Sequence, residues 1–133
     1  MTDPAGGVGL SVIVVDDQPD VRRLMRAVFE RSGFEVLGEA VDGVDALNIY
    51  RSQPVGRRAT AVVMDYQMPV MNGLDAAIAM LADDPRQLIV LCSAVLTDEI
   101  VDAATRAGVT MCAPKREIVD LPDVLVALAA AGP

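Results

Sequence analysis

Hydrophobic and polar positions along this chain form a repeated pattern. A short apolar run is followed by a longer segment whose apolar residues recur at helical spacing, and this pair occurs five times between residues 10 and 131. In the first unit, residues 10–15 are predicted to form a buried strand. A helix is predicted from Pro19 to the stop signal at Ser32-Gly33, with an apolar stripe at Val21, Leu24, Met25, Val28 and Phe29.

The other four units follow the same plan. Strands are predicted over residues 34–40, 61–64, 88–92 and 109–113. Helices are predicted over about 44–52, after Asn72-Gly73, between a Thr97 cap and Gly108, and from Asp120 to a stop at Gly132. The predicted buried stripes are Leu74, Ala77, Ile78 and Leu81 in the third helix and Leu121, Val124, Leu125 and Leu128 in the fifth.

The alternation of strands and helices predicts the fold class. Strands that are apolar on both faces require a parallel sheet with helices on both sides, because an open sheet would leave one apolar face in water. We therefore expect a doubly wound α/β domain. In such sheets ligands bind at the carboxyl ends of the strands, so the residues that end each strand are the first candidates for a site.

Composition narrows the class of protein. A chain of 133 residues is expected to form one domain, here residues 10–131 behind an N-terminal tail at 1–9. The longest apolar stretch, residues 124–131, is too short to span a membrane, and no signal segment is visible, so we expect a cytoplasmic protein without membrane insertion. A formal charge of −8 without a segregated basic face argues against direct nucleic-acid binding. Cys92 and Cys112 lie in apolar runs and are expected to be free, buried thiols.

The predicted strand ends carry acidic and basic side chains. The first strand ends at Asp16-Asp17, the third at Asp65, the fourth at Ser93, and the fifth runs into Pro114-Lys115. The carboxyl ends of these strands converge on one edge, which would place the three carboxylates a few ångströms apart. Each close pair would then repel by about 4 kcal/mol at an effective dielectric near 20, so a cation is needed to neutralise the cluster. The chain has no histidine, and oxygen ligands favour Mg²⁺.

These residue types suit phosphoryl chemistry. The Asp65 carboxylate is a candidate nucleophile toward phosphorus, which would give an aspartyl phosphate. Magnesium and Lys115, the only lysine of the chain, would offset the charge of the phosphoryl oxygens, and the Ser93 hydroxyl would donate to one of them.

The chain resembles the receiver domain of bacterial two-component response regulators over residues 10–130. The resemblance is carried by the acid pair Asp16-Asp17, the stretch from Asp65 to Asp75 (DYQMPVMNGLD), the Ser93-Ala94 step and Lys115. The resemblance implies a flavodoxin-like (βα)5 fold with strand order 2-1-3-4-5. It also implies that Asp65 accepts a phosphoryl group from a histidine kinase or phosphotransfer protein. Asp16, Asp17, Asp65 and the backbone carbonyl of Gln67 would then bind Mg²⁺, and Ser93 and Lys115 would contact the phosphoryl group.

The same resemblance implies a signalling module, which is expected to be of the single-domain type or else a receiver cut from a longer regulator. Such a module is not an enzyme in the usual sense, although it assists its own phosphoryl transfer and dephosphorylation. Phosphorylation would switch the face formed by residues 97–107, 109–113 and 121–130 toward an unknown downstream partner, or toward a second copy of the chain. Two departures from the family pattern concern this face. Cys112 stands where an aromatic residue is usual, and Pro114 precedes Lys115 while Arg116 replaces the usual following proline.

Other interpretations remain open at this point. Asp16 and Asp17 are also suitable as caps of the first helix. A flavin-binding protein of this fold would need a phosphate-cradling loop after the first strand, where this chain has two acids. A magnesium-dependent aspartate phosphatase would show an Asp-x-Asp pair and cap segments. The main alternative is a receiver-fold interaction module that signals without phosphorylation, which Cys112 and Arg116 motivate.

Overall fold

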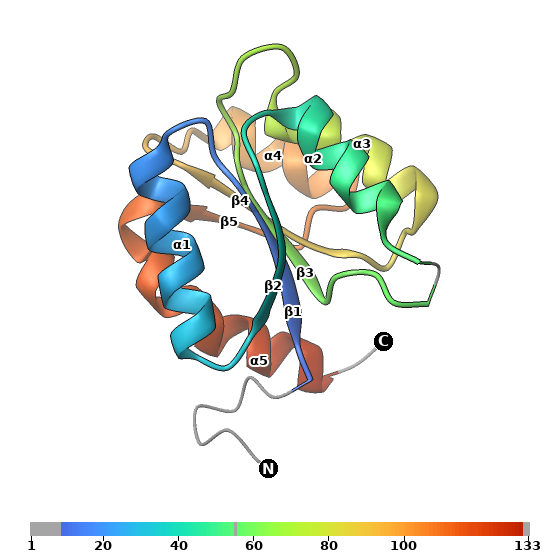
Figure 1. Ribbon diagram of the computed structural model, residues 1–133. Coiled ribbons are helices and arrows are strands. Elements are labelled where there is room, and N and C mark those ends of the chain that lie inside the picture. Colours follow the sequence, from blue (N-terminus) through green and yellow to red (C-terminus); the bar gives the residue numbers. More distant parts are fainter. Residues whose placement is uncertain (1–8, 55, 132–133) are drawn as a thin grey trace.

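The computed structural model describes residues 9–54 and 56–131, so most of the predicted tail and the Gly132 stop lie outside the described residues. One parallel sheet in the order β2-β1-β3-β4-β5 forms the centre of the molecule (Figure 1). The strands are β1 (Ser11–Val15), β2 (Glu35–Ala40), β3 (Ala61–Asp65), β4 (Leu88–Ser93) and β5 (Met111–Pro114). The doubly wound α/β prediction and the strand order are confirmed.

Helices cover both faces of the sheet. They are α1 (Pro19–Arg31), α2 (Gly43–Ser52), α3 (Gly73–Asp83), α4 (Asp98–Ala107) and α5 (Leu121–Ala131), with a short 3-10 helix, η1 (Lys115–Asp120), before α5. Helices α1 and α5 lie on one face and α2, α3 and α4 on the other (Figure 1). The sequence pattern did not predict η1, because its single buried residue, Ile118, leaves no helical stripe to detect.

Local signals set the helix ends. The side chains of Asp42, Asn72 and Thr97 accept hydrogen bonds from backbone N–H groups of Asp45, Asp75 and Ile100. Gly108 ends α4 in the left-handed conformation with φ 97°, which glycine adopts without strain. Strand β5 starts at Met111 instead of 109, because the Val109 N–H donates to the Ala104 carbonyl and so belongs to the end of α4.

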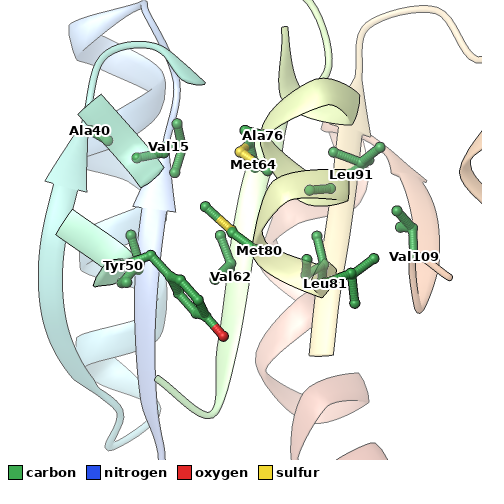
Figure 2. Close-up of a cluster of buried hydrophobic side chains, with 14 of the residues drawn as sticks. Val15, Ala40, Tyr50, Val62, Met64, Ala76, Met80, Leu81, Leu91 and Val109 are labelled. Carbon is green, nitrogen blue, oxygen red and sulfur yellow. The ribbon is translucent and has the colours of Figure 1, made fainter. Parts of the chain in front are cut away.

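Two apolar clusters, one on each face, hold the layers together. Alternate residues of the central strands point to opposite faces, so Ile13 and Val15 join one cluster while Val12 and Val14 join the other. The cluster beneath α2, α3 and α4 contains Tyr50, which lies near Met80 and Val62 in Figure 2. The sheet is therefore closely packed on both faces, and this packing fixes the positions of the side chains at its carboxyl edge.

Three sequence predictions of burial were wrong. Leu24 is 45% exposed and Ile78 is 48% exposed, although both were predicted to face the core. In α3 the buried face is instead formed by Ala76, Ala77, Met80 and Leu81. Cys112 is half-buried, in contrast to the fully buried Cys92, because β5 is an edge strand while β4 lies inside the sheet. Both thiols are free, as predicted.

Within residues 9–54 and 56–131, no helix has the length and apolar character needed to cross a bilayer.

Candidate functional site

The carboxyl edge of the sheet brings three carboxylates together. Val15 pairs with Met64 in the β1–β3 register, so the residues that follow, Asp16 and Asp65, emerge side by side. Asp16 is 0% and Asp65 is 3% exposed, whereas Asp17 is exposed. One carboxylate oxygen from each of the three lies within 4.8 Å of the others. Two buried acids and one exposed acid thus form a cluster with an open side.

Lys115 supplies the positive charge of this cluster. It follows the last residue of β5, and its Nζ lies 2.9 Å from Asp16 Oδ2 and 3.2 Å from Asp65 Oδ2. Burial alone lowers the pKa of Lys115, but the hydrogen bond to Asp16 and the negative charges of Asp65 and Asp16 outweigh burial and raise it. One ammonium therefore stays charged among three carboxylates, which leaves an excess of negative charge.

The environment of Asp65 shifts the pKa of its carboxyl group. Burial is the main cause that raises the pKa of the Asp65 carboxyl above its usual 3.8, and the charge of Asp16 adds to it. Lys115 and the Gln67 N–H, which donates to Asp65 Oδ1 at 3.3 Å, oppose the rise without cancelling it. The metal-free site consequently holds its negative charge at a cost to folding stability.

This cost predicts a pH-dependent difference between the wild type and Asp65→Asn. The folded protein binds the Asp65 proton more tightly than the unfolded chain, so metal-free wild type loses stability as pH rises from about 4 through the folded pKa. At pH 7 without Mg²⁺, Asp65→Asn is expected to be more stable than the wild type, because it does not carry the buried charge. Urea unfolding in EDTA from pH 3.5 to 7 measures the difference. A constant difference across this range would contradict the prediction.

Asp16 is held on several sides. Its N–H donates to the Ala40 carbonyl at 3.1 Å, and its Oδ1 accepts from the Gln18 N–H at 2.9 Å. The N-cap position of α1 is Gln18, which makes no side-chain capping hydrogen bond. The acid pair therefore does not cap α1, and that alternative does not explain why two acids end β1.

Gln67 and Ser93 border the cluster in different ways. Gln67 is exposed and contacts Asp65 through its backbone N–H. Ser93 is 2% exposed, and its hydroxyl donates to the Val95 carbonyl at 2.7 Å while accepting from the Val95 N–H at 3.3 Å. Among the described residues, the hydroxyl therefore forms hydrogen bonds within its own loop and none with the carboxylates.

The loop after Asp65 is packed closely by a glycine. The Gly73 N–H donates to the Tyr66 carbonyl at 2.9 Å, and a Cβ added to Gly73 would overlap the Asp65 carbonyl oxygen. Val70, in the same loop, has φ 70°, and the Met71 N–H donates to the Pro69 carbonyl at 2.8 Å across it. This γ-turn is strained for a β-branched residue. The sequence identified Asn72-Gly73 as a helix start but gave no sign of the backbone contact with Asp65.

The donor set fits a magnesium ion. The ligands on offer are carboxylate oxygens, the type that Mg²⁺ prefers, and the cluster carries more negative charge than Lys115 balances. Asp16 Oδ2 is buried, and the Lys115 ammonium lies 2.9 Å from it. Because this one ammonium is shared with Asp65, a divalent cation would supply positive charge that the three carboxylates still lack.

Comparison with known proteins agrees with this geometry. A family model described as the response regulator receiver domain matches residues 12–126. The chain belongs to this family. Receiver domains are signalling modules of two-component and chemotaxis systems and not classical enzymes, and phosphorylation and Mg²⁺ binding at an acidic pocket are general to the family.

The receiver domain has several curated relatives. It is 35% identical over 101 residues to the chemotaxis protein CheY of Thermotoga maritima, covering 76% of this chain and 81% of CheY. It is 34% identical over 116 residues to a protein-glutamate methylesterase/protein-glutamine glutaminase of Hahella chejuensis. That match covers 86% of this chain but 32% of the relative, so the receiver domain spans about a third of that longer protein.

Solved structures match the receiver domain over nearly its whole length. The receiver domain of the putative response regulator NarL from Mycobacterium tuberculosis superposes with a TM-score of 0.78 at 29% identity, covering 95% of this chain and 99% of that one. A chain of the CheX–CheY–BeF3–Mg complex from Borrelia burgdorferi gives a TM-score of 0.82 at 17% identity, covering 98% and 100%. At that identity the second match shows the fold alone.

One residue next to the site was missed by the sequence analysis. Arg22 of α1 donates from Nη1 to the Asp16 backbone carbonyl at 2.8 Å. Nothing in the apolar stripe or in the strand-end acids singles it out, because the contact joins a helix side chain to a backbone atom six residues earlier.

Proposed function

We propose that this receiver domain is switched by phosphorylation of Asp65. The observation that carries the proposal is a buried carboxylate, Asp65, held 3.2 Å from the Lys115 ammonium within an acidic cluster that fits Mg²⁺. In the reaction an Asp65 oxygen forms a bond to phosphorus, and the bond from phosphorus to the donor imidazole nitrogen breaks. The electron pair leaves with the imidazole, which takes up a proton. A histidine kinase or a phosphotransfer protein is the proposed donor.

The residues of the site have separate roles in this proposal. Asp16, Asp17, Asp65 and the Gln67 carbonyl would hold Mg²⁺, which supplies charge neutralisation at the phosphoryl oxygens when bound. Lys115 already lies against Asp65 and would pair with one phosphoryl oxygen. Ser93 would have to release the Val95 carbonyl before its hydroxyl donates to another. That release would move the loop between β4 and α4. Phosphorylation of Asp65 would in this way change the structure at the molecular surface.

The proposed output surface is the face formed by α4, β5 and α5. The loop that Ser93 would pull leads into α4, and Lys115 connects β5 to η1 and α5. Phosphorylation adds about −1.5 to −2 charges at Asp65, which supplies the force for such a shift. The partner at this face is either a downstream protein or a second copy of the chain.

We also propose a cytoplasmic location, where a kinase of this type would act.

A second candidate function is an interaction module that signals without phosphorylation. The observation that favours it is Cys112, which occupies the usual aromatic position on β5 and is only half-buried. Without a ring that can turn inward, the aromatic part of a conformational switch is missing. The two functions differ in whether Asp65 accepts a phosphoryl group.

Intact mass spectrometry tests the proposal. The wild type is incubated with an acyl phosphate and Mg²⁺, alongside a sample in EDTA and the variant Asp65→Asn. We expect the mass of one added phosphoryl group in the wild type alone with Mg²⁺ present, because Asp65 is the nucleophile and the metal offsets charge. Asp75→Asn is the matched control, since Asp75 is an exposed acid in the first turn of α3 and should leave the adduct unchanged.

The absence of an adduct in folded wild type would favour the interaction module. An adduct that persists in Asp65→Asn would place the phosphoacceptor elsewhere. An adduct that forms equally in EDTA would remove the metal from the proposed reaction.

A further inference from the structure

Arg22 reaches from α1 to the backbone of the acid pair. Its Nη1 donates to the Asp16 carbonyl at 2.8 Å, and its side chain is only 17% exposed. An arginine in the second turn of a surface helix normally extends into water, where its several donors are satisfied without cost. Here the guanidinium is folded back over the start of α1, onto the peptide group that joins Asp16 to Asp17.

That peptide group sets the direction of Asp17. The Asp16 side of it is anchored by the Ala40 carbonyl, by Gln18 and by Lys115. Within the described residues, no hydrogen bond holds the exposed Asp17 carboxylate itself. Its position relative to Asp16 and Asp65 therefore depends on the orientation of the preceding peptide plane, which the hydrogen bond from Arg22 fixes.

Glu39 holds the other side of the guanidinium. Arg22 Nε lies 3.8 Å from Glu39 Oε1, and the other oxygen of Glu39 accepts from Arg26 Nη1 at 2.8 Å. Glu39 belongs to β2 and pairs with Val14 of β1 in the sheet register. Arg22 is thereby braced between α1, β2 and the loop after β1, which leaves it little freedom to swing away from the Asp16 carbonyl.

We propose that Arg22 is a positioning residue for the metal-binding acid pair: its hydrogen bond to the Asp16 carbonyl fixes the peptide that aims Asp17 at the cation. The inference rests on the proposed function, because it presupposes that Asp16, Asp17 and Asp65 bind Mg²⁺. Arg22 itself touches neither the metal nor the phosphoryl group. Groups that orient metal ligands in this way commonly affect metal affinity about 10- to 100-fold when they are removed.

The test is the Mg²⁺ affinity of metal-free protein, measured by calorimetric titration with MgCl₂. Arg22→Met keeps the apolar stem and removes the donor, and we expect its Kd for Mg²⁺ to rise about tenfold. Arg23→Met is the matched control, because Arg23 is the next residue of α1, is 75% exposed and pairs only with Asp20, at 3.5 Å, within the described residues. It should bind Mg²⁺ as the wild type does.

A second readout reports on the hydrogen bond directly. The Asp17 amide nitrogen belongs to the same peptide group as the Asp16 carbonyl, so its NMR resonance should shift in Arg22→Met and stay in place in Arg23→Met. Arg22→Lys provides a variant with a milder change of shape. Its ammonium retains a charged donor for the carbonyl, and we expect an affinity between those of the wild type and Arg22→Met.

The outcomes separate this inference from the proposed function. A lower melting temperature with unchanged Mg²⁺ affinity in both Arg22 variants would make Arg22 a structural brace and overturn the inference, while phosphorylation of Asp65 would stand. Wild type that binds no Mg²⁺ and gains no phosphoryl group would overturn both. Weaker binding in Arg22→Met together with the Asp17 shift is the supporting result.

Discussion

Replacing Gly73 with alanine is expected to destabilise the domain by about 3 kcal/mol, at the upper end of the cost of overpacking a core. The added Cβ would overlap the backbone carbonyl oxygen of Asp65 and lie 3.1 Å from Leu91 Cδ2. A backbone atom at the end of β3 cannot rotate away as a side chain can. The strand end carrying Asp65 must move, so phosphoryl uptake should fall together with stability. Urea unfolding measures the first effect and intact mass the second.

Gly38→Ala is the control for this substitution. Gly38 lies in β2, and a Cβ there would meet Ile49 Cγ2 at 2.8 Å, a side-chain atom of α2 that can shift. We expect a loss of about 1 kcal/mol or less from Gly38→Ala. Equal losses in the two variants would show that the contact with the Asp65 carbonyl is not the source of the effect.

Removal of the Lys115 charge is expected to have the largest effect on phosphoryl uptake. In Lys115→Met the carboxylates of Asp16 and Asp65 lose their ammonium at 2.9 and 3.2 Å, and the phosphoryl oxygens lose a charged donor. Loss of one such group typically slows a reaction about 10²- to 10³-fold. The rate of adduct formation, followed by intact mass at saturating Mg²⁺, measures the change.

The same variant should also lose stability without metal. Breaking a buried ion pair costs about 3 to 5 kcal/mol, and the partial exposure of Lys115 reduces this to about 2 kcal/mol. Arg116→Met is the matched control, since Arg116 is 78% exposed and its ion pair with Glu117, at 4.0 Å, is long. A Lys115→Met protein that takes up phosphoryl groups at the wild-type rate would exclude Lys115 from the reaction.

The strained turn at Val70 lies in a loop that connects the site to helix α2. Val70 is 85% exposed, so its side chain contributes little packing to offset a positive φ. The turn is instead held by its neighbours, because the Met71 carbonyl accepts from the Gly43 N–H at 3.1 Å. A Cβ on Gly43 would lie 2.5 Å from that oxygen. The loop that follows Asp65 is thereby tied to the start of α2, so a shift of the loop would be transmitted to that helix.

The sequence by itself determined the order of elements, the doubly wound α/β class and the edge at which the acids meet. Strand and helix periodicity are local properties of the chain, and the carboxyl ends of parallel strands must share one edge. Asp16, Asp17, Asp65 and Lys115 were therefore found from their positions alone. The family motifs added the strand order and the expected chemistry, because they match along nearly the whole domain.

Only the tertiary structure decided which groups touch. The sharing of Lys115 between Asp16 and Asp65 depends on how η1 leaves β5, which no periodicity reports. The Ser93 hydroxyl bonds its own loop because Val95 offers both a donor and an acceptor two residues away. Helix α3 buries Ala76 and Met80 and leaves Ile78 outside, so the face that it turns toward the sheet was set by packing. Contacts such as Arg22 with the Asp16 carbonyl join atoms through space, so they exist only once strand register and helix packing have set the distances.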